Sequence, residues 1–110
     1  MQTAIVVYQS TSVTISTAET GLQMSSMDNQ LVSLATPNHT QSLVPGIYKI
    51  VSNQTVGVSG GESLIETATT NTKSDVPPLP SKATQSFPPL NTQTWNAFFA
   101  TPDAKALSGV

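Results

Sequence analysis

Five residues in the middle of the chain match the pattern around the nucleophilic serine of many hydrolases. Gly57 to Gly61 read GVSGG, a G-x-S-x-G sequence with Ser59 at its centre. In such hydrolases the serine lies between a strand and a helix of a large α/β sheet, and an acidic residue and then a histidine follow it in the chain. Here the only histidine, His39, precedes Ser59, and 110 residues are too few for that fold. We therefore expect a glycine turn, with a serine hydrolase using Ser59 as a remote alternative.

The other residues that could do chemistry lack the partner residues that a metal site or a catalytic site needs. His39 lies in the loop-like stretch TPNHTQ, and the chain has no cysteine and no second histidine, so a transition-metal site would lack most of its ligands. Glu62 and Glu66 could share one face of an element, but paired carboxylates need a cleft for acid/base work, and the sequence locates none. We accordingly expect no catalytic residue, no metal and no cofactor.

A proline-rich stretch is the most specific short motif. Residues 76 to 82 read VPPLPSK and fit the pattern P-x-x-P-x-K. A polyproline II helix offers proline and aliphatic side chains to an aromatic groove, while the basic residue meets an acidic rim. These seven residues resemble an SH3-domain ligand. The alternatives are a plain spacer and an arm packed along its own domain or a neighbour. The residues expected to make such a contact are Val76, Pro77, Leu79, Pro80 and Lys82.

Three aromatic residues near the end of the chain have helical spacing. Trp95, Phe98 and Phe99 fall at i, i+3 and i+4, which predicts a short helix with one aromatic face. Residues 101–103 are typical of a helix cap and first turn, and Gly109 is typical of a C-terminal stop. The aromatic face either docks on the sheet as part of the core or anchors a partner or a sister subunit.

The first two-thirds of the chain are typical of short β-strands. Residues 3–8 and 11–18 are rich in β-branched side chains and lack charge, and we expect them to pair through Gln9 and Ser10. Such an uncharged ribbon would promote aggregation at an open edge, so it should be central, covered or paired with another subunit. Pro45-Gly46 predicts a turn with Gly46 at positive φ. Further strands are expected at 47–53, at 55–60 as the hairpin partner of 47–53, and at 63–69, with a turn at Gly60-Gly61.

Residues 26–35 allow two interpretations. Apolar residues recur at helical spacing behind Ser26 as a plausible N-cap, with Pro37 beyond the end. The stretch QLVSLA reads equally well as a strand, so helix and strand both stay open. The residues that carry the helical spacing are Met27, Leu31, Leu34 and Ala35.

Charge is too scarce for some classes of partner. Only 9% of residues are charged, arginine is absent and the net charge is −2, so we exclude nucleic acid as a main partner. Without cysteine there is no disulfide framework. The N-terminal apolar run is too short for a signal peptide or a membrane span. The compartment stays open between the cytoplasm and export by a leaderless or processed route.

The sequence as a whole predicts a mainly β protein. We expect a small antiparallel sandwich or partly open barrel of five or six short strands over residues 1–73, a proline-rich linker or arm over 74–90, and a short aromatic helical tail over 91–110. By elimination, the leading function is a non-enzymatic interaction or structural module, self-associating or exposed at a surface, with a protein partner or a sister subunit. The alternative is a small-ligand-binding β-domain with a pocket between sheet and tail, lined by Tyr48 or Trp95.

Overall fold

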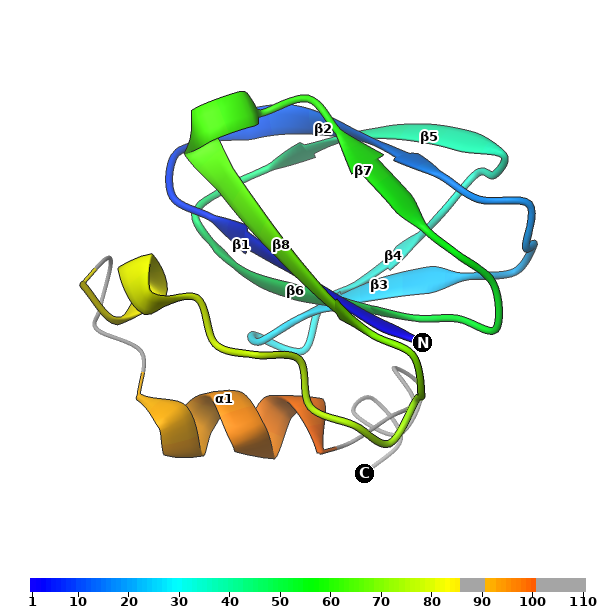
Figure 1. Cartoon of the computed structure of the whole chain (residues 1–110). Coiled ribbons are helices and arrows are strands. Elements are labelled where there is room, and N and C mark those ends of the chain that lie inside the picture. Colours follow the sequence, from blue (N-terminus) through cyan, green and yellow to red (C-terminus); the bar gives the residue numbers. More distant parts are fainter. Residues whose placement is uncertain (86–90, 101–110) are drawn as a thin grey trace.

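Two antiparallel sheets and a helix make up the part of the chain that the computed structural model describes, residues 1–85 and 91–100 (Figure 1). The larger sheet has the strand order β4-β3-β6-β1-β8, and the smaller sheet has the order β5-β2-β7. The mainly β class is confirmed, with eight strands in two open sheets in place of five or six. The elements are β1 Gln2–Val7, β2 Thr11–Ser16, β3 Gln23–Ser26, β4 Leu31–Ser33, β5 Asn38–Leu43, β6 Gly46–Val51, β7 Gly57–Ser59, η1 Glu62–Leu64, β8 Ile65–Thr70, η2 Ser81–Gln85 and α1 Thr92–Phe99.

The uncharged N-terminal strands occupy interior positions, as expected. β1 lies between β6 and β8, and all six of its residues are buried. A strand that is covered on both faces needs apolar or small residues at successive positions, which the run Ala4 to Val7 supplies. β2 is the middle strand of the smaller sheet. Neither strand therefore offers an open edge.

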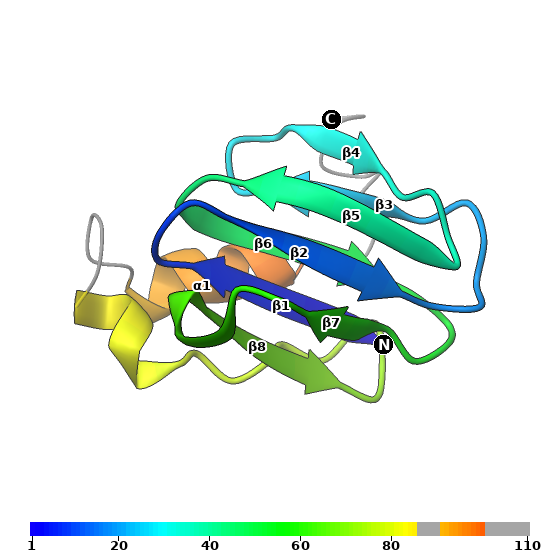
Figure 2. The same cartoon turned by 90° about the horizontal axis from the view of Figure 1, so that it is seen from above.

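The larger sheet separates two clusters of buried side chains. Figure 1 shows the smaller sheet on one side of it and α1 on the other, and Figure 2 shows β5, β2 and β7 lying over the larger sheet. The inner core, between the sheets, consists of Ile5, Val7, Val13, Ile15, Leu22, Met24, Leu34, Leu43, Tyr48, Ile50 and Val56. The outer core, between the larger sheet and the C-terminal segments, consists of Ala4, Val6, Ile47, Ala83, Trp95, Phe98 and Phe99.

The two expected hairpins are wrong. β1 pairs with β6 and β8, whereas β2 pairs with β5 and β7, so residues 8–10 cross from one sheet to the other. Likewise β7 pairs with β2 and not with β6, and Val58 packs against the inner core. In both cases the chain changes sheets, because two packed sheets bury both sets of apolar side chains.

The helical interpretation of residues 26–35 is also wrong. β3 and β4 form a hairpin there, and Ser26 accepts hydrogen bonds at its Oγ from the backbone N of Asp28 at 3.2 Å and of Gln30 at 3.1 Å. Asn29 takes a left-handed φ of 67°, a conformation that asparagine tolerates well. Ser26 thus caps a tight turn where the sequence suggested a helix N-terminus.

Gly60, which directly follows β7, has a backbone conformation that only glycine adopts without strain. Gly60 and Gly61 have φ values of 85° and 71°, as expected for a turn. A Cβ at Gly60 would lie 2.9 Å from the backbone oxygen of Ser12 in β2. Gly46, by contrast, is the first residue of β6 and pairs with Val7, and its φ is not positive, so the positive φ predicted for Gly46 is wrong.

Gly60→Ala should therefore destabilise the protein more than the matched variant Gly21→Ala. Gly21 has a similar φ of 76° but open space where its Cβ would be. Gly21→Ala should lower the free energy of unfolding by about 1–2 kcal/mol, the cost of a left-handed alanine. The contact with β2 should add about 1 kcal/mol or more at Gly60. Urea denaturation of the two variants measures the difference, and equal losses would contradict this account.

Within residues 1–85 and 91–100, no helix has the length and apolar character needed to cross a lipid bilayer.

Candidate interaction surfaces

Ser59 and His39 lie on opposite faces of the smaller sheet. Ser59 in β7 is the register partner of Thr14, and His39 in β5 is the partner of Ile15, the next residue of β2. Because successive side chains of a strand point to opposite faces, the hydroxyl of Ser59 and the ring of His39 are directed apart. The ring nitrogens of His39 are also engaged, with Nδ1 accepting from the backbone N of Ala35 at 3.1 Å and Nε2 lying 2.9 Å from Gln41 Oε1. The structure brings no histidine to Ser59.

The predicted aromatic helix is α1. Asn91 caps its N-terminus, accepting at Oδ1 from the backbone N of Thr94 at 2.7 Å. Trp95, Phe98 and Phe99 all point to the sheet and are 1%, 7% and 0% exposed. The ring centroids of Trp95 and Phe99 are 4.5 Å apart, and those of Phe98 and Phe99 are 4.9 Å apart. The aromatic face is thus packed within its own chain. The cap, first turn and stop predicted at residues 101–103 and Gly109 lie outside the described residues.

Two polar side chains of the sheet bind the C-terminal end of α1. Lys49 in β6 donates from Nζ to the carbonyl oxygen of Phe98 at 2.8 Å, with the ammonium 4.6 Å from the ring centroid of Phe98. Gln2 in β1 donates from Nε2 to the carbonyl oxygens of Phe99 at 2.9 Å and Asp75 at 2.8 Å. The last carbonyls of a helix lack intrahelical partners, and a cation near that end is favourable. Lys49 and Gln2 therefore fix where the helix ends on the sheet.

Sequence analysis missed both of these polar side chains. A lysine at the centre of the apolar strand GIYKIV is the signal that could have identified Lys49, since a buried lysine needs a partner. Ser25 is its register partner on β3, and Ser25 Oγ has no hydrogen-bond partner among the described residues. A serine beside a lysine can act as a nucleophile and base. Here Lys49 and Ser25 are both 0% exposed, so no substrate reaches them in this arrangement.

The proline-rich stretch runs along the same side of the larger sheet as α1. Pro77 is buried and Val76, Leu79 and Pro80 are half-buried, with Val76 and Leu79 packed against the outer core. Trp95 donates from Nε1 to the carbonyl oxygen of Pro77 at 2.7 Å. In this structure the stretch therefore packs along its own domain. A role as an SH3-type ligand stays a prediction.

The basic residue of the motif meets an aromatic ring of its own sheet. Lys82 is exposed, and its Nζ lies 4.7 Å from the ring centroid of Tyr8. Tyr8 donates from its hydroxyl to Glu66 Oε1 at 2.5 Å. Burial, and then the hydrogen bond to Glu66, raise the pKa of Tyr8 above its ordinary value. Tyr8 and Glu66 thus give Lys82 an aromatic surface beside a carboxylate within its own chain.

The outer face of the smaller sheet is polar and uncharged. Its side chains are linked across β2 and β5 in three rungs, with oxygen–oxygen distances of 3.3 Å for Ser12 and Ser42, 3.2 Å for Thr14 and Thr40, and 2.8 Å for Ser16 and Asn38. Such cross-strand pairs hold side chains in place on a sheet. We call this surface the hydroxyl face; it consists of Ser12, Thr14, Ser16, Asn38, Thr40, Ser42 and Ser59.

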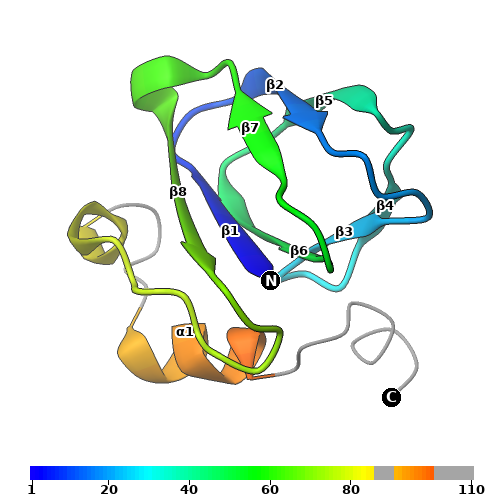
Figure 3. The same ribbon diagram turned by 45° about the vertical axis from the view of Figure 1, so that its right-hand side comes forward.

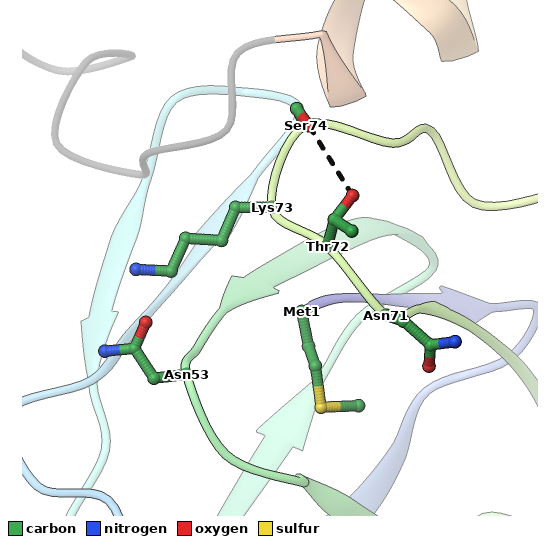
Figure 4. A pocket seen from close by; sticks show the side chains of 6 residues that line it. All are labelled: Met1, Asn53, Asn71, Thr72, Lys73 and Ser74. Carbon is green, nitrogen blue, oxygen red and sulfur yellow. Dashed lines mark hydrogen bonds between the residues drawn. The ribbon is translucent and has the colours of Figure 1, made fainter.

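A shallow hollow of about 490 Å³ lies near the start of β1 (Figure 4). It is lined by Met1, Asn53 and residues 71–74, including Lys73. The sequence suggested Tyr48 or Trp95 as ligand-lining residues, but Tyr48 belongs to the inner core and Trp95 to the outer core. The hydroxyl of Tyr48 donates to the carbonyl oxygen of Val44 at 2.6 Å, and burial raises its pKa. Neither side chain lines the hollow.

Comparisons with protein-family models, with curated proteins and with solved structures found no match for this chain. The function must therefore be inferred from the surfaces described above.

Proposed function

We propose that this chain is a non-enzymatic structural module that self-associates through exposed β-strands that carry little charge. One observation carries the proposal: the hydroxyl face and the edge strand β8 are solvent-accessible and contain a single charged side chain, Glu66, which is bound by Tyr8. Uncharged strands with open edges are the surfaces by which sheets most readily pair with other chains. A net charge of −2 gives little repulsion between copies.

The packing of the aromatic tail favours the strands over the tail as the contact surface. The sequence offered the uncharged N-terminal strands, of which β2 contributes to the hydroxyl face, and the aromatic tail as contact surfaces. The aromatic rings of the tail, however, are buried against their own sheet. Using them to bind a neighbour would first require α1 to leave Lys49 and Gln2. Contacts through the strands require no such rearrangement.

The geometry around Ser59 supports the non-enzymatic part of the proposal. A nucleophilic serine needs a base within hydrogen-bond reach, and His39 is directed to the other face. A serine-reactive fluorophosphonate should therefore leave the folded chain unlabelled. Labelling that Ser59→Ala abolishes would contradict this part of the proposal.

Absolute mass in solution tests the self-association. Size-exclusion chromatography with light scattering should give a mass that rises above the 11.5 kDa of the monomer as the concentration increases from micromolar to millimolar. A mass of 11.5 kDa throughout that range would overturn the proposal. Repeating the series at high salt serves as a control, since contacts between uncharged strands should change little with ionic strength.

Small-ligand binding is the second candidate, and the hollow near the start of β1 favours it. The amides of Asn53 and Asn71 and the ammonium of Lys73 are groups that could orient a polar ligand there. Titration with pooled metabolites, followed by backbone amide NMR shifts, would support this candidate if the shifts cluster at Asn53 and residues 71–74. Shifts that Lys73→Ala leaves unchanged would count against the hollow as the site.

A further inference from the structure

β8 is an open edge of the larger sheet, beside β1 (Figure 3). It pairs with β1 over six consecutive residues without a bulge, and among the described residues no strand pairs with its other side. Its sequence IETATT contains no proline and no lysine, two residues by which natural edges avoid pairing, and its one charged residue is Glu66. Two of the other edge strands, β4 and β7, have three residues each.

The fourth edge strand is β5, which is as long as β8 but less suited to pairing. Its sequence NHTQSL has Thr40 as its one β-branched residue, whereas β8 has four, Ile65, Thr67, Thr69 and Thr70. β-Branched residues favour the extended conformation that a new pair of strands requires. β8 is thus the edge that the sequence equips best for pairing.

The hydrogen bonds between β1 and β8 determine which backbone groups of β8 face outward. Tyr8 N donates to the carbonyl oxygen of Leu64 at 2.8 Å, so these opposite residues form a hydrogen-bonded pair. Such pairs alternate along an antiparallel ladder, so Glu66 and Ala68 also bond to β1. The N–H and C=O groups of the residues between them point to the open side. These residues are Ile65, Thr67 and Thr69.

We propose that two copies of this chain pair antiparallel through β8, about a twofold axis at Thr67. In this register Thr67 faces Thr67 of the second copy and Ile65 faces Thr69, so all outward groups are used, in three pairs that exchange two hydrogen bonds each. The two larger sheets then form one continuous sheet across the axis, an isologous contact. The inference rests on the proposed self-association and names its site.

The chemistry of the strand identifies the occupant as a second copy. The register places Glu66 opposite Ala68, so the one charged residue of β8 does not face its own equivalent. Thr67 and Thr69 are exposed and can be approached by another strand. A contact of one strand per copy lies at the small end of specific interfaces, so we expect a weak dimer that forms with rising concentration.

Single cysteines test the register directly, because the chain has none of its own. Opposite residues of a hydrogen-bonded pair have Cα atoms about 5.5 Å apart, within the range for a disulfide. Thr67→Cys should therefore form an intermolecular disulfide on oxidation. In Thr69→Cys the two sulfur-bearing residues would be about 13 Å apart along the strands, too far to join. We expect the disulfide-linked dimer to form at least about tenfold faster in Thr67→Cys than in Thr69→Cys, since only Thr67→Cys holds its two thiols close together.

A proline at the axis tests the backbone bonds. Thr67→Pro removes an outward N–H without removing a bond to β1, because Thr67 and Ile5 are a non-hydrogen-bonded pair. The loss of both equivalent bonds should weaken the dimer at least about tenfold while the melting temperature of the monomer is retained. Thr67→Val keeps the N–H and the β-branch, and should dimerise like the natural chain.

The outcomes separate this inference from the proposed function. A natural chain that stays monomeric overturns both. An oligomeric chain in which Thr67→Cys and Thr69→Cys oxidise at equal rates overturns pairing through β8 and leaves self-association standing. Pairing through β8 is likewise overturned, and self-association left standing, if Thr67→Pro folds and forms a dimer as tight as that of Thr67→Val. If Thr67→Pro fails to fold, the ratio of the two oxidation rates decides alone.

Discussion

Trp95→Ala should lower the free energy of unfolding by about 3–5 kcal/mol, a large part of the 5–15 kcal/mol typical of a domain. Trp95 is 1% exposed at the centre of the outer core, where it contacts Phe99 and donates to Pro77. The substitution removes the largest buried side chain of the protein and leaves the carbonyl of Pro77 without its donor. The lost packing and the lost hydrogen bond both lower the free energy of unfolding.

The matched control is Asn96→Ala, one residue further along α1. Asn96 is exposed, so the substitution removes no packing and introduces a better helix former. Urea denaturation followed by circular dichroism should give nearly the natural stability for Asn96→Ala. Circular dichroism is required because Trp95 is the only tryptophan and Trp95→Ala leaves no such fluorophore. A loss below about 1 kcal/mol for Trp95→Ala would mean that the outer core contributes little.

The structure confirms those sequence expectations that depend on local spacing. The i, i+3, i+4 pattern of Trp95, Phe98 and Phe99 predicted a helix, and α1 spans Thr92–Phe99. The uncharged run of β-branched residues over 11–18 predicted a strand, and β2 lies there with Val13 and Ile15 buried. Helical and extended periodicities place residues on one face within a few positions, so they can be seen in the sequence of a single element.

Strand pairing could not be predicted in the same way. β1 pairs with β6 and β8, some forty to seventy residues away, because the backbone N–H and C=O groups on both edges of a buried strand need hydrogen-bond partners. Which strands supply those partners depends on the packing of the whole chain, and no short pattern encodes it. The same holds for Lys49 and Gln2, whose partners on α1 are far along the chain. The helical interpretation of residues 26–35 was wrong for a different reason. A short apolar run fits both the helical and the extended period, so its sequence does not distinguish a helix from a strand.

The candidate surfaces were predictable to the extent that they depend on composition. Only 9% of residues are charged, and the hydroxyl face, which is formed by uncharged polar side chains, agrees with that composition. Which strand carries the open edge depends on topology: β1 and β8 are both rich in β-branched residues, but β1 lies inside the sheet. The composition thus indicated the chemistry of the exposed strands, whereas only the topology identifies β8 as an open edge.

Removing residues 74–110 should abolish cooperative folding, so that a chain ending at Lys73 aggregates. The truncation uncovers Ala4, Val6 and Ile47 and leaves the ammonium of Lys49 on an apolar surface. Burial of each large apolar side chain contributes about 1.5–3 kcal/mol, so loss of the whole outer cluster approaches the full stability of a domain. Thermal unfolding followed by circular dichroism should then show no cooperative transition.

A synthetic peptide of residues 74–110 supplies the control, because its aromatic helix can dock on the sheet without a covalent connection. Adding it in excess should restore a cooperative transition, and the same peptide with Trp95→Ala should do so only weakly, since it lacks the central side chain of the cluster. A chain ending at Lys73 that unfolds cooperatively by itself would contradict this expectation. It would mean that the larger sheet is stable uncovered, and that the aromatic helix is separable from the fold and free to bind a neighbour.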